Sequence, residues 1–294
     1  MRRAAQWRTS LALYAPAALL IGAVYAYPIL RTAFLSLFHF SLATGFQLEF
    51  AGLENFTRLA GDSRFLGSLA ATAIFTVVSV SLEFGIGLLL ALAATGQKRA
   101  RGLIRAALLA PWTLPTAVTA VLWTWIFNDQ FGVLNEVLQR LRVIDAPVAW
   151  LAAPGTAMAA VIVADVWKTA PFVFLVLLAG LQNIPAELYE AIEIDGGGAW
   201  AKFRYVTWPH LTPFAFTALA FRVIQAFAMF DLVWVMTGGG PGGATETVSV
   251  YSYRTYMRYL DFGYGSAQAI AVVAILAALA LLLYGAFMRH ERRV

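Results

Sequence analysis

Six charged residues lie within the long apolar stretches of this chain, and these side chains are the best placed to do chemistry. A charge at the centre of a bilayer costs about 2.5–3.5 kcal/mol on insertion scales, so each one needs a partner, a water-filled cavity or a position near the interface. Such groups can pair structurally, line a solute path, couple transport to ions or act as catalytic acids. The six are Arg31, Glu83, Asp165, Lys168, Arg222 and Asp231.

Two helical faces collect most of these polar residues, because positions i, i+3, i+4 and i+7 of a helix share a face. The rule groups Asp165, Lys168, Thr169 and Phe172 on one predicted helix, and Arg222, Gln225 and Met229 on another. Faces that mix charge, amide and aromatic groups suit a path for a hydroxyl-rich solute, since sugars stack on rings and hydrogen-bond to polar groups.

The same charges also allow a purely structural interpretation. Asp165 and Lys168 are spaced to form a salt bridge with each other. Arg222, in turn, could neutralise Asp231 or Glu83. Sequence alone leaves this alternative open.

Composition indicates that membrane spans must position these residues. The chain has 294 residues, of which 61% are hydrophobic and 13% charged, whereas soluble domains carry about 25% charged residues. A span needs roughly 20 apolar residues. We expect one transmembrane domain over residues 1–294, and its first apolar run is too long for a cleaved signal peptide. The expected spans are about 11–38, 66–94, 103–127, 155–181, 211–236 and 264–288.

The distribution of Lys and Arg predicts the orientation, because these residues are retained on the cytoplasmic side. One side carries twelve: Arg2, Arg3, Arg8, Lys98, Arg99, Arg101, Arg105, Lys202, Arg204, Arg289, Arg292 and Arg293. The other side carries six: Arg58, Arg64, Arg140, Arg142, Arg254 and Arg258. Both termini are therefore expected in the cytoplasm. The glycine-rich stretch "TGGGPGGATETVS" then becomes a flexible external connection. Because the basic residues cluster beside apolar spans, the net charge of +5 indicates membrane topology and no nucleic-acid partner.

A polar segment between the fourth and fifth spans predicts a folded helix–turn–helix outside the bilayer. In "IPAELYEAIEIDGGGAWAKFRYVTWP", Pro185 suits the first helical position, and Gly196 and Gly197 suit the helix end. A second short helix is expected over about 199–206. The first helix sets an apolar face beside an acidic stripe, which fits either a helix lying on the membrane or a docking knob for a soluble partner. The stripe comprises Glu187, Glu190 and Glu193.

The same segment resembles the EAA loop of permease subunits in bacterial ABC importers. That pattern begins E-A-A-x-x-D-G-A and continues to a Phe and a final Leu-Pro. The residues in register are Glu190, Ala191, Asp195, Gly196, Phe203 and Pro209, and those that depart are Ile192, Gly197, Val206 and Trp208. "TGGGPGGATETVSVYSYRTYM" and "FAGLENFTRL" also resemble the carbohydrate branch, in particular its larger maltose-permease type.

This resemblance implies a fold and a set of partners. The fold is an all-α, six-span type I ABC importer permease with a cytoplasmic coupling helix–turn–helix over about 183–210. The partners are a second homologous permease subunit, two ATPase subunits and an extracytoplasmic sugar-binding protein, all at the bacterial inner membrane. The coupling residues implied are Glu187, Glu190, Ala191, Asp195, Gly196, Phe203 and Pro209, and the two polar faces above become the substrate path.

The resemblance also implies the activity, which is import of a sugar or oligosaccharide by alternating access. A disaccharide such as maltose or trehalose is favoured, because no basic cluster for a phosphate lies in the spans. The chain contains no G-x-x-x-x-G-K-[ST] motif, so ATP and Mg²⁺ are expected in the partner ATPases and no cofactor in this chain. Three alternatives remain: a permease for glycerol-3-phosphate or another polar solute, an ion-coupled secondary transporter, and a membrane-embedded enzyme that uses the same acids.

Overall fold

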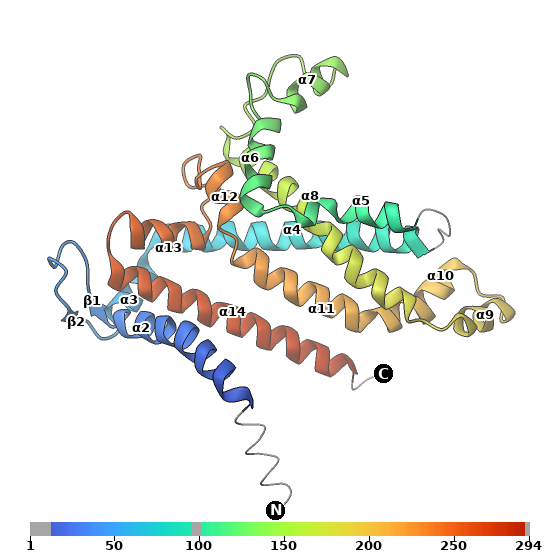
Figure 1. Cartoon of the computed structure of the whole chain (residues 1–294). Helices are drawn as coiled ribbons and strands as arrows, with labels where there is room; N and C mark the ends of the chain where they lie inside the picture. Colours follow the sequence, from blue (N-terminus) through green and yellow to red (C-terminus); the bar gives the residue numbers. More distant parts are fainter. Residues whose placement is uncertain (1–12, 96–100, 292–294) are drawn as a thin grey trace, which may run out of the picture. The chain divides into compact units, whose positions relative to one another are not determined.

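The computed structural model describes residues 13–95 and 101–291, with the side chains of Arg101, Leu103, Ile104, Arg105, His290 and Glu291 excepted (Figure 1). Seven of the basic residues used for the orientation lie outside the described residues: Arg2, Arg3, Arg8, Lys98, Arg99, Arg292 and Arg293. The first two residues of the predicted 11–38 span also lie outside them. The orientation therefore stays a prediction.

The chain forms two compact units: Met1–Ser63 with Ser252–Ile275, and Arg64–Tyr251 with Leu276–Val294. The first unit holds a π-turn, a helix, a two-stranded hairpin and a short helix. These are η1 (Gly22–Ala26), α2 (Tyr27–Leu35), β1 (Phe38–His39), β2 (Glu49–Phe50) and α3 (Glu54–Gly61). Phe38 pairs with Phe50 in the antiparallel hairpin.

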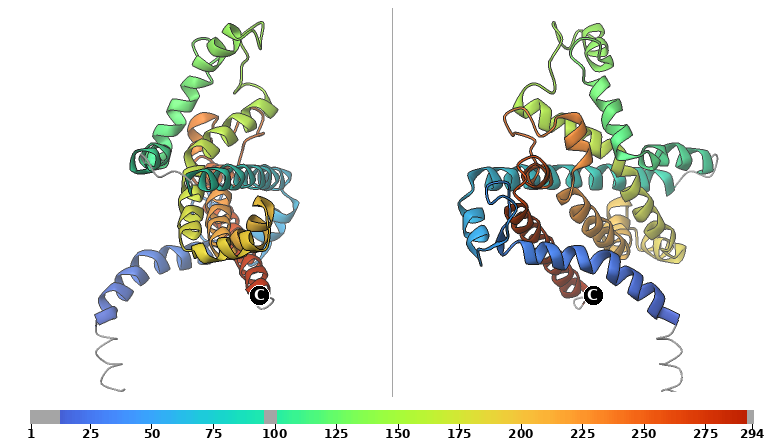
Figure 2. Two further views of the ribbon diagram at one scale, coloured as in Figure 1. Left: turned by 90° about the vertical axis from the view of Figure 1, so that its right-hand side faces the viewer. Right: turned by 60° about the vertical axis from the view of Figure 1, so that its left-hand side comes forward.

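The second unit is helical in the residues that the structure describes. Its helices are α4 (Ser63–Thr95), α5 (Arg101–Thr113), α6 (Thr116–Ile126), α7 (Val133–Arg140), α8 (Pro154–Gln182), α9 (Ala186–Ile194), α10 (Ala199–Ala201), η2 (Lys202–Thr207), α11 (Trp208–Phe227) and α12 (Asp231–Met236). Two helices cross from one unit to the other: α13 (Val248–Met257) and α14 (Phe262–Glu291). Within the second unit, α8 and α11 run side by side (Figures 1 and 2).

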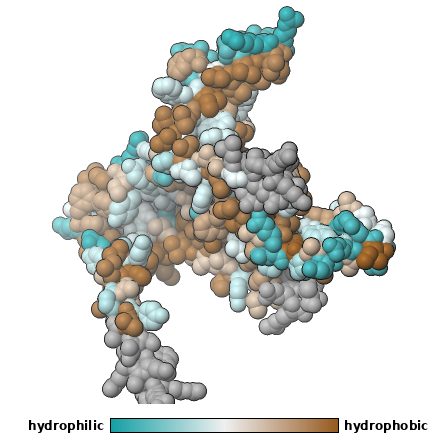
Figure 3. All heavy atoms as spheres, turned by 45° about the vertical axis from the view of Figure 1, so that its right-hand side comes forward, coloured by the Kyte–Doolittle hydropathy of each residue, from teal (hydrophilic) through white to brown (hydrophobic). Residues whose placement is uncertain are grey.

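Four helical segments are long and apolar enough to cross a membrane, so the all-α membrane fold is confirmed. They are Leu13–Leu35, Ser63–Thr95, Pro154–Gln182 and Phe262–Arg289. Apolar surface is extensive, and Figure 3 shows hydrophilic residues concentrated at the tip that carries α7. The predicted count of six spans stays a prediction.

The predicted span over about 103–127 is wrong as one continuous helix. The chain bends by 98° between Ala106–Thr113 and Thr116–Ile126, as the right panel of Figure 2 shows. Pro115 lies in the break with φ −56° and ψ 139°, and a proline disfavours helical geometry in the residue before it. If the bent pair counts as one span, the candidates number up to five.

The predicted span over about 211–236 is also divided. α11 ends at Phe227, and α12 begins at Asp231. Phe230 has φ −126° and ψ −61°, which is outside the helical region, and Asp231 then places a carboxylate in the first turn of α12. Hydropathy averaged over a span could not reveal this break, because the residues on both sides of it are apolar apart from Asp231.

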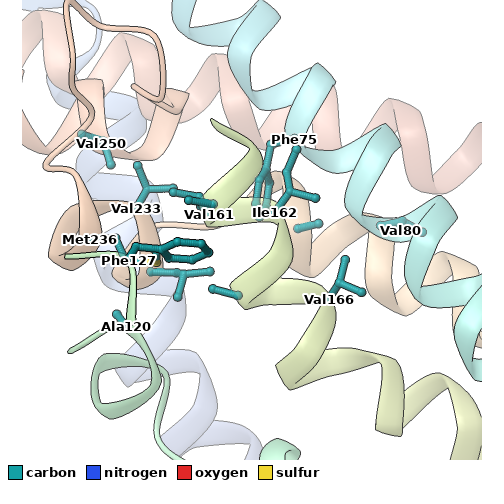
Figure 4. Close-up of a cluster of buried hydrophobic side chains, with 14 of the residues drawn as sticks. Phe75, Val80, Ala120, Phe127, Val161, Ile162, Val166, Val233, Met236 and Val250 are labelled. Carbon is teal, nitrogen blue, oxygen red and sulfur yellow. The ribbon is translucent and has the colours of Figure 1, made fainter. Parts of the chain in front are cut away.

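The core of the second unit lies along α8, which packs against several neighbours. Phe75, Val161 and Val233 belong to one apolar cluster, shown in Figure 4. A second cluster includes Phe174 and Leu211. Packing is tight there, since a Cβ at Gly180 would lie 2.9 Å from Cδ1 of Leu211.

Two pairs of small residues four positions apart on α4, Ser81/Gly85 and Gly87/Ala91, differ in role. A Cβ at Gly87 would lie 2.8 Å from the Cβ of Val173, and Ala91 is fully buried, so this pair packs against α8. Gly85 has nothing within 4 Å, and Ser81 is exposed. The spacing of Ser81 and Gly85 therefore serves no packing contact among the described residues.

The glycine-rich loop between α12 and α13 is folded back on itself, contrary to the expected flexible connection. The hydroxyls of Thr237 and Thr245 lie 2.7 Å apart, and Thr245 donates to the carbonyl of Gly240 at 2.7 Å. Gly239 has φ +88°, a left-handed geometry that glycine adopts without strain.

In the first unit, Asn55 fixes the chain on the N-terminal side of the hairpin. Its amide donates to the carbonyls of Ser36 and Phe38 at 3.0 and 2.9 Å, and the residue is 1% exposed. Arg58 binds Asp261 at 3.0 Å and stacks over the ring of Tyr264. The buried residues of the "FAGLENFTRL" stretch, Asn55 and Leu59, therefore have a structural role.

Candidate functional site

Three helices meet at a buried ion cluster, to which α4 contributes Glu83, α8 contributes Asp165 and α11 contributes Arg222. The Arg222 Nε and Nη2 donate to the two carboxylate oxygens of Glu83 at 2.5 and 2.9 Å. Nη2 also donates to Asp165 Oδ2 at 3.0 Å. All three side chains are at most 2% exposed, so the guanidinium charge of Arg222 is compensated by carboxylates within the helix bundle.

Gln225 completes the coordination of this arginine. Its Oε1 accepts a hydrogen bond from Arg222 Nη1 at 2.9 Å. A guanidinium has five N–H groups, and four of them now donate hydrogen bonds: the one at Nε, both at Nη2 and one at Nη1. The bidentate geometry fixes the guanidinium plane, which Lys could not do.

The structural interpretation of the charges is confirmed in one part and wrong in another. Arg222 pairs with Glu83, as one of the two proposed pairings requires, and does not pair with Asp231. The Asp165–Lys168 salt bridge is wrong, because Asp165 instead binds Arg222. Within the described ranges, neither Lys168 nor Asp231 forms an ion pair.

A polar pocket of about 460 Å³ opens beside the cluster. Its lining residues are Trp112, Thr116, Asp165, Lys168, Thr169, Arg222, Gln225, Ala228, Met229, Phe230 and Asp231. Of the seven residues predicted for a substrate path, the structure brings all except Phe172 to this pocket. The Phe172 ring instead lies between Trp112 and Phe221, at centroid distances of 5.8 and 4.9 Å.

Sequence reasoning missed several lining residues for identifiable reasons. Trp112 and Thr116 lie on either side of the bend at Pro115, so no single helical face joins them. Phe230 and Asp231 follow the break after α11, where the i, i+3, i+7 rule stops. Asp231 had one available signal, since its charge lies within an apolar stretch.

The pocket offers hydrogen-bonding groups that the protein itself does not use. Asp165 Oδ1 is buried and has no partner among the described residues, and Lys168 is half-buried without an ion pair. Asp231 adds an exposed carboxylate at the start of α12. Donors and acceptors that line one pocket suit a molecule rich in hydroxyls. In the part of the chain that the structure describes, no group of three or more metal-binding side chains occurs.

The loop between α8 and α11 is the second candidate site. α9 is followed by a turn at Gly196, which has φ +77°. Tyr189 and Thr207 hydroxyls lie 3.0 Å apart, and Lys202 binds Glu193. The predicted coupling residues fall on this loop: Glu187, Glu190, Ala191, Asp195 and Gly196 are exposed, whereas Phe203 and Pro209 are half-buried.

Three details of this loop differ from the predictions. Pro185 precedes the helix as its N-cap and is not the first helical residue. No separate helix covers 199–206, because α10 continues through η2 directly into α11. Gly197 does not adopt a positive φ, so Gly196 alone makes the left-handed turn of this segment.

Gly197 is required for a different reason, which is space. A Cβ at this position would lie 2.4 Å from Cγ2 of Ile192. Both residues depart from the EAA pattern, which has alanine at each position. The larger Ile192 thus fills the volume that a side chain at 197 would need, and the two departures compensate each other.

A bundle of apolar helices that buries an ion cluster beside an open polar pocket is typical of a membrane protein with a functional site inside the bundle. The chain belongs to the family described as "Binding-protein-dependent transport system inner membrane component", which matches residues 83–294. It is accordingly a multi-pass permease subunit of an ABC importer.

Relatives and a solved structure are consistent with this family. The chain is 39% identical over 263 residues to the sulfoquinovosyl glycerol transport system permease protein SmoG of Agrobacterium fabrum, covering 90% of this chain and 85% of the relative. It is 42% identical over 243 residues to the trehalose/maltose transport system permease protein MalF of Thermococcus litoralis, covering 83% and 81%. A bacterial alginate ABC transporter, in complex with an alginate pentasaccharide-bound periplasmic protein, has the same fold with a TM-score of 0.82 at 19% identity, covering 96% of this chain and 94% of that one.

Proposed function

We propose that this subunit carries a sugar or small oligosaccharide, with a disaccharide favoured, through the pocket beside the Glu83–Arg222–Asp165 cluster. The observation that carries the proposal is the gathering of six predicted path residues around one polar pocket. Its volume of about 460 Å³ lies within the range of roughly 300–1,000 Å³ typical of small-molecule sites. Trehalose and maltose, for which one of the two sequence relatives is named, are disaccharides, which supports the same class.

The charge balance of the pocket favours a neutral solute. Lys168 and Arg222 contribute positive charge, and Asp165 and Asp231 contribute negative charge. Since Glu83 and Asp165 already neutralise Arg222, only Lys168 remains to meet an anion. A phosphate would need more donors than one ammonium supplies, so glycerol-3-phosphate is the weaker candidate.

In this proposal, different pocket residues make different contacts with the sugar. Lys168 donates to hydroxyl oxygens, and Asp165 Oδ1 and Asp231 accept from hydroxyl groups. Trp112, which is 42% exposed, offers an aromatic face. The ion cluster holds the three helices that present these groups and does not itself release Arg222 to the solute.

The proposed partners follow from the exposed surfaces. Both termini and the loop over 183–210 face the cytoplasm, and the exposed acids of α9 dock on an ATPase subunit. ATP and Mg²⁺ bind in a pair of such ATPases, whose closure moves the loop and switches the spans between inward- and outward-facing states. A second permease subunit covers Leu13–Leu35 and Phe262–Arg289, whose most apolar stretches have no buried residues. An external binding protein delivers the sugar.

Reconstituted transport tests this proposal. The complete importer in proteoliposomes is expected to take up labelled trehalose or maltose only when both ATP and the binding protein are present. Lys168→Gln and Gln225→Ala should each raise the KM for the sugar. Uptake that continues without ATP and follows an ion gradient would establish the secondary-transporter alternative instead.

A further inference from the structure

The glycine-rich loop, residues 237–247, is a folded element with fixed attachments to two helices. Three threonine hydroxyls organise it. Those of Thr237 and Thr245 close the loop on itself, and that of Thr247 reaches out of it. A Cβ on Gly239 would lie 3.2 Å from both Glu246 and Val250, so the loop also packs closely against its own C-terminal end.

One end of the attachment is α4. Glu246 accepts two hydrogen bonds from Arg64, from Nε at 2.8 Å and from Nη2 at 3.0 Å. The Glu246 side chain is 3% exposed and that of Arg64 is 43% exposed, so the acid of this bidentate pair is shielded from water while the arginine reaches the surface. The backbone N–H of Val248 also donates to Thr72 Oγ1 at 2.9 Å. These bonds anchor the loop on a long, well-packed helix.

The other end of the attachment is the wall of the polar pocket. Thr247 Oγ1 donates to the carbonyl of Met229 at 2.9 Å. Met229 lies in the break between α11 and α12, where backbone carbonyls lack the regular helical partners. Met229, Phe230 and Asp231 all line the pocket. The loop thereby joins α4 to the one non-helical segment of the pocket wall.

We propose that Thr247 is a positioning residue that holds the wall segment Met229–Asp231 in place, with Glu246 and Arg64 as its anchor. The residue touches no solute and acts through the Met229 carbonyl. The positioning role stands on the contacts alone, whereas its effect on sugar affinity rests on the proposed function. A loosened wall would raise the KM for the sugar and leave the maximal rate unchanged.

Matched threonine variants separate this role from general stability. Thr245 and Thr247 are both fully buried in the same loop, but only Thr247 bonds to the pocket wall. Thr247→Val removes that bond, Thr247→Ser keeps it, and Thr245→Val removes only bonds within the loop. Because the chain has no cysteine, Met229→Cys introduces a single thiol and retains the backbone carbonyl.

The experiment measures how fast that thiol reacts with a charged maleimide in membrane vesicles that hold the assembled importer. Thr247→Val should raise the labelling rate about two- to tenfold, the range that loss of one hydrogen bond gives. Thr247→Ser and Thr245→Val should stay within about twofold of the parent. Equal rates in Thr247→Val and the parent would overturn the positioning role.

A second reporter controls for the start of α13, because Thr247 also accepts from the N–H of Val250 at 3.4 Å. A thiol at Ser249→Cys should label at the same rate in Thr247→Val and in its parent. If both reporters accelerate together, the variant has loosened α13 and the inference is wrong. If the Met229→Cys rate rises while the KM for sugar does not, the positioning role stands and the sugar pocket of the proposed function fails.

Discussion

Arg222 and Glu83 form a two-point ion pair across 139 positions of the sequence, with donor–acceptor distances of 2.5 and 2.9 Å. The pair joins α11 to α4, and Asp165 of α8 binds the same guanidinium. Three helices that line or support the pocket are therefore held at one point. Because the groups are buried, removing Arg222 would leave two carboxylates without compensation, and removing Glu83 would leave two guanidinium hydrogens without their acceptors.

Glu83→Leu is expected to destabilise the protein by about 3–5 kcal/mol, because the buried Arg222 loses the acceptors of its Nε and of one Nη2 hydrogen and keeps only Asp165 as a charged partner. Unfolding in mixed detergent micelles would measure it. The exposed pair Glu136–Arg140 provides the control, and Glu136→Gln should cost no more than about 0.5 kcal/mol. Replacing Glu83, Asp165 and Arg222 together by leucine should recover part of the loss. If Glu83→Leu and the control unfold with the same free energy, the ion cluster does not stabilise the helix bundle.

Gln225→Ala should raise the KM for the sugar while the importer still assembles. The side chain lines the pocket and bonds only to one Nη1 hydrogen of Arg222, so its loss leaves the ion cluster intact. The expected loss is roughly three- to tenfold in kcat/KM, corresponding to one hydrogen bond. Arg222→Ala is a poor substitute, because it would destabilise the bundle. Thr217→Val, on the exposed side of α11, is the matched control and should transport normally.

Glu190→Lys should abolish transport and weaken co-purification of the ATPase subunits. The residue is exposed on α9 and forms no ion pair among the described residues, so the substitution acts on the partner surface and not on folding. Gly196→Pro should have the same result through the turn, since proline cannot adopt φ +77°. Glu136→Lys on α7 is the charge-matched control. Full ATPase recovery with sugar-stimulated hydrolysis in Glu190→Lys would remove this loop from the coupling pathway.

Gly197→Ala should distort the turn after α9, because its Cβ would lie 2.4 Å from Cγ2 of Ile192. Overpacking of this kind costs typically about 1–3 kcal/mol. Adding Ile192→Ala should reverse the defect, which makes the two changes strongly non-additive. Gly198→Ala is the control, since nothing lies within 4 Å of its Cβ position and its φ is negative. Hydrolysis coupled to transport is the measurement, and purely additive effects would contradict the compensation.

Helical periodicity made much of the candidate site predictable. Spacing alone placed Asp165, Lys168 and Thr169 on one face, and the structure brings that face to the pocket. The same spacing wrongly assigned Phe172 to the pocket, whereas its ring packs between other aromatic rings. Only part of a helix face lines a pocket, and periodicity does not show which part. The predicted turn after α9 was confirmed at Gly196 for a similarly local reason.

The breaks in helices were beyond the reach of the sequence patterns. Hydropathy averages over about a whole span, so it joined residues that Pro115 and Phe230 separate. At the second break, the hydroxyl of Thr247 donates to the carbonyl of Met229, although the two residues are 18 positions apart in the sequence. The pocket residues Phe230 and Asp231 were lost from the prediction with it.

The sequence by itself determined the class of fold, the membrane setting, the polar faces of individual helices and the acidic turn between α8 and α11. These properties depend on neighbours within a few positions, where backbone geometry is regular. The tertiary structure alone decided that Arg222 pairs with Glu83 and Asp165, that Lys168 is left for the pocket, and that Ile192 takes the space at Gly197. Those outcomes depend on which helices meet and how each is rotated, because ion pairs and packing act over a few ångströms in space, whatever the separation along the chain.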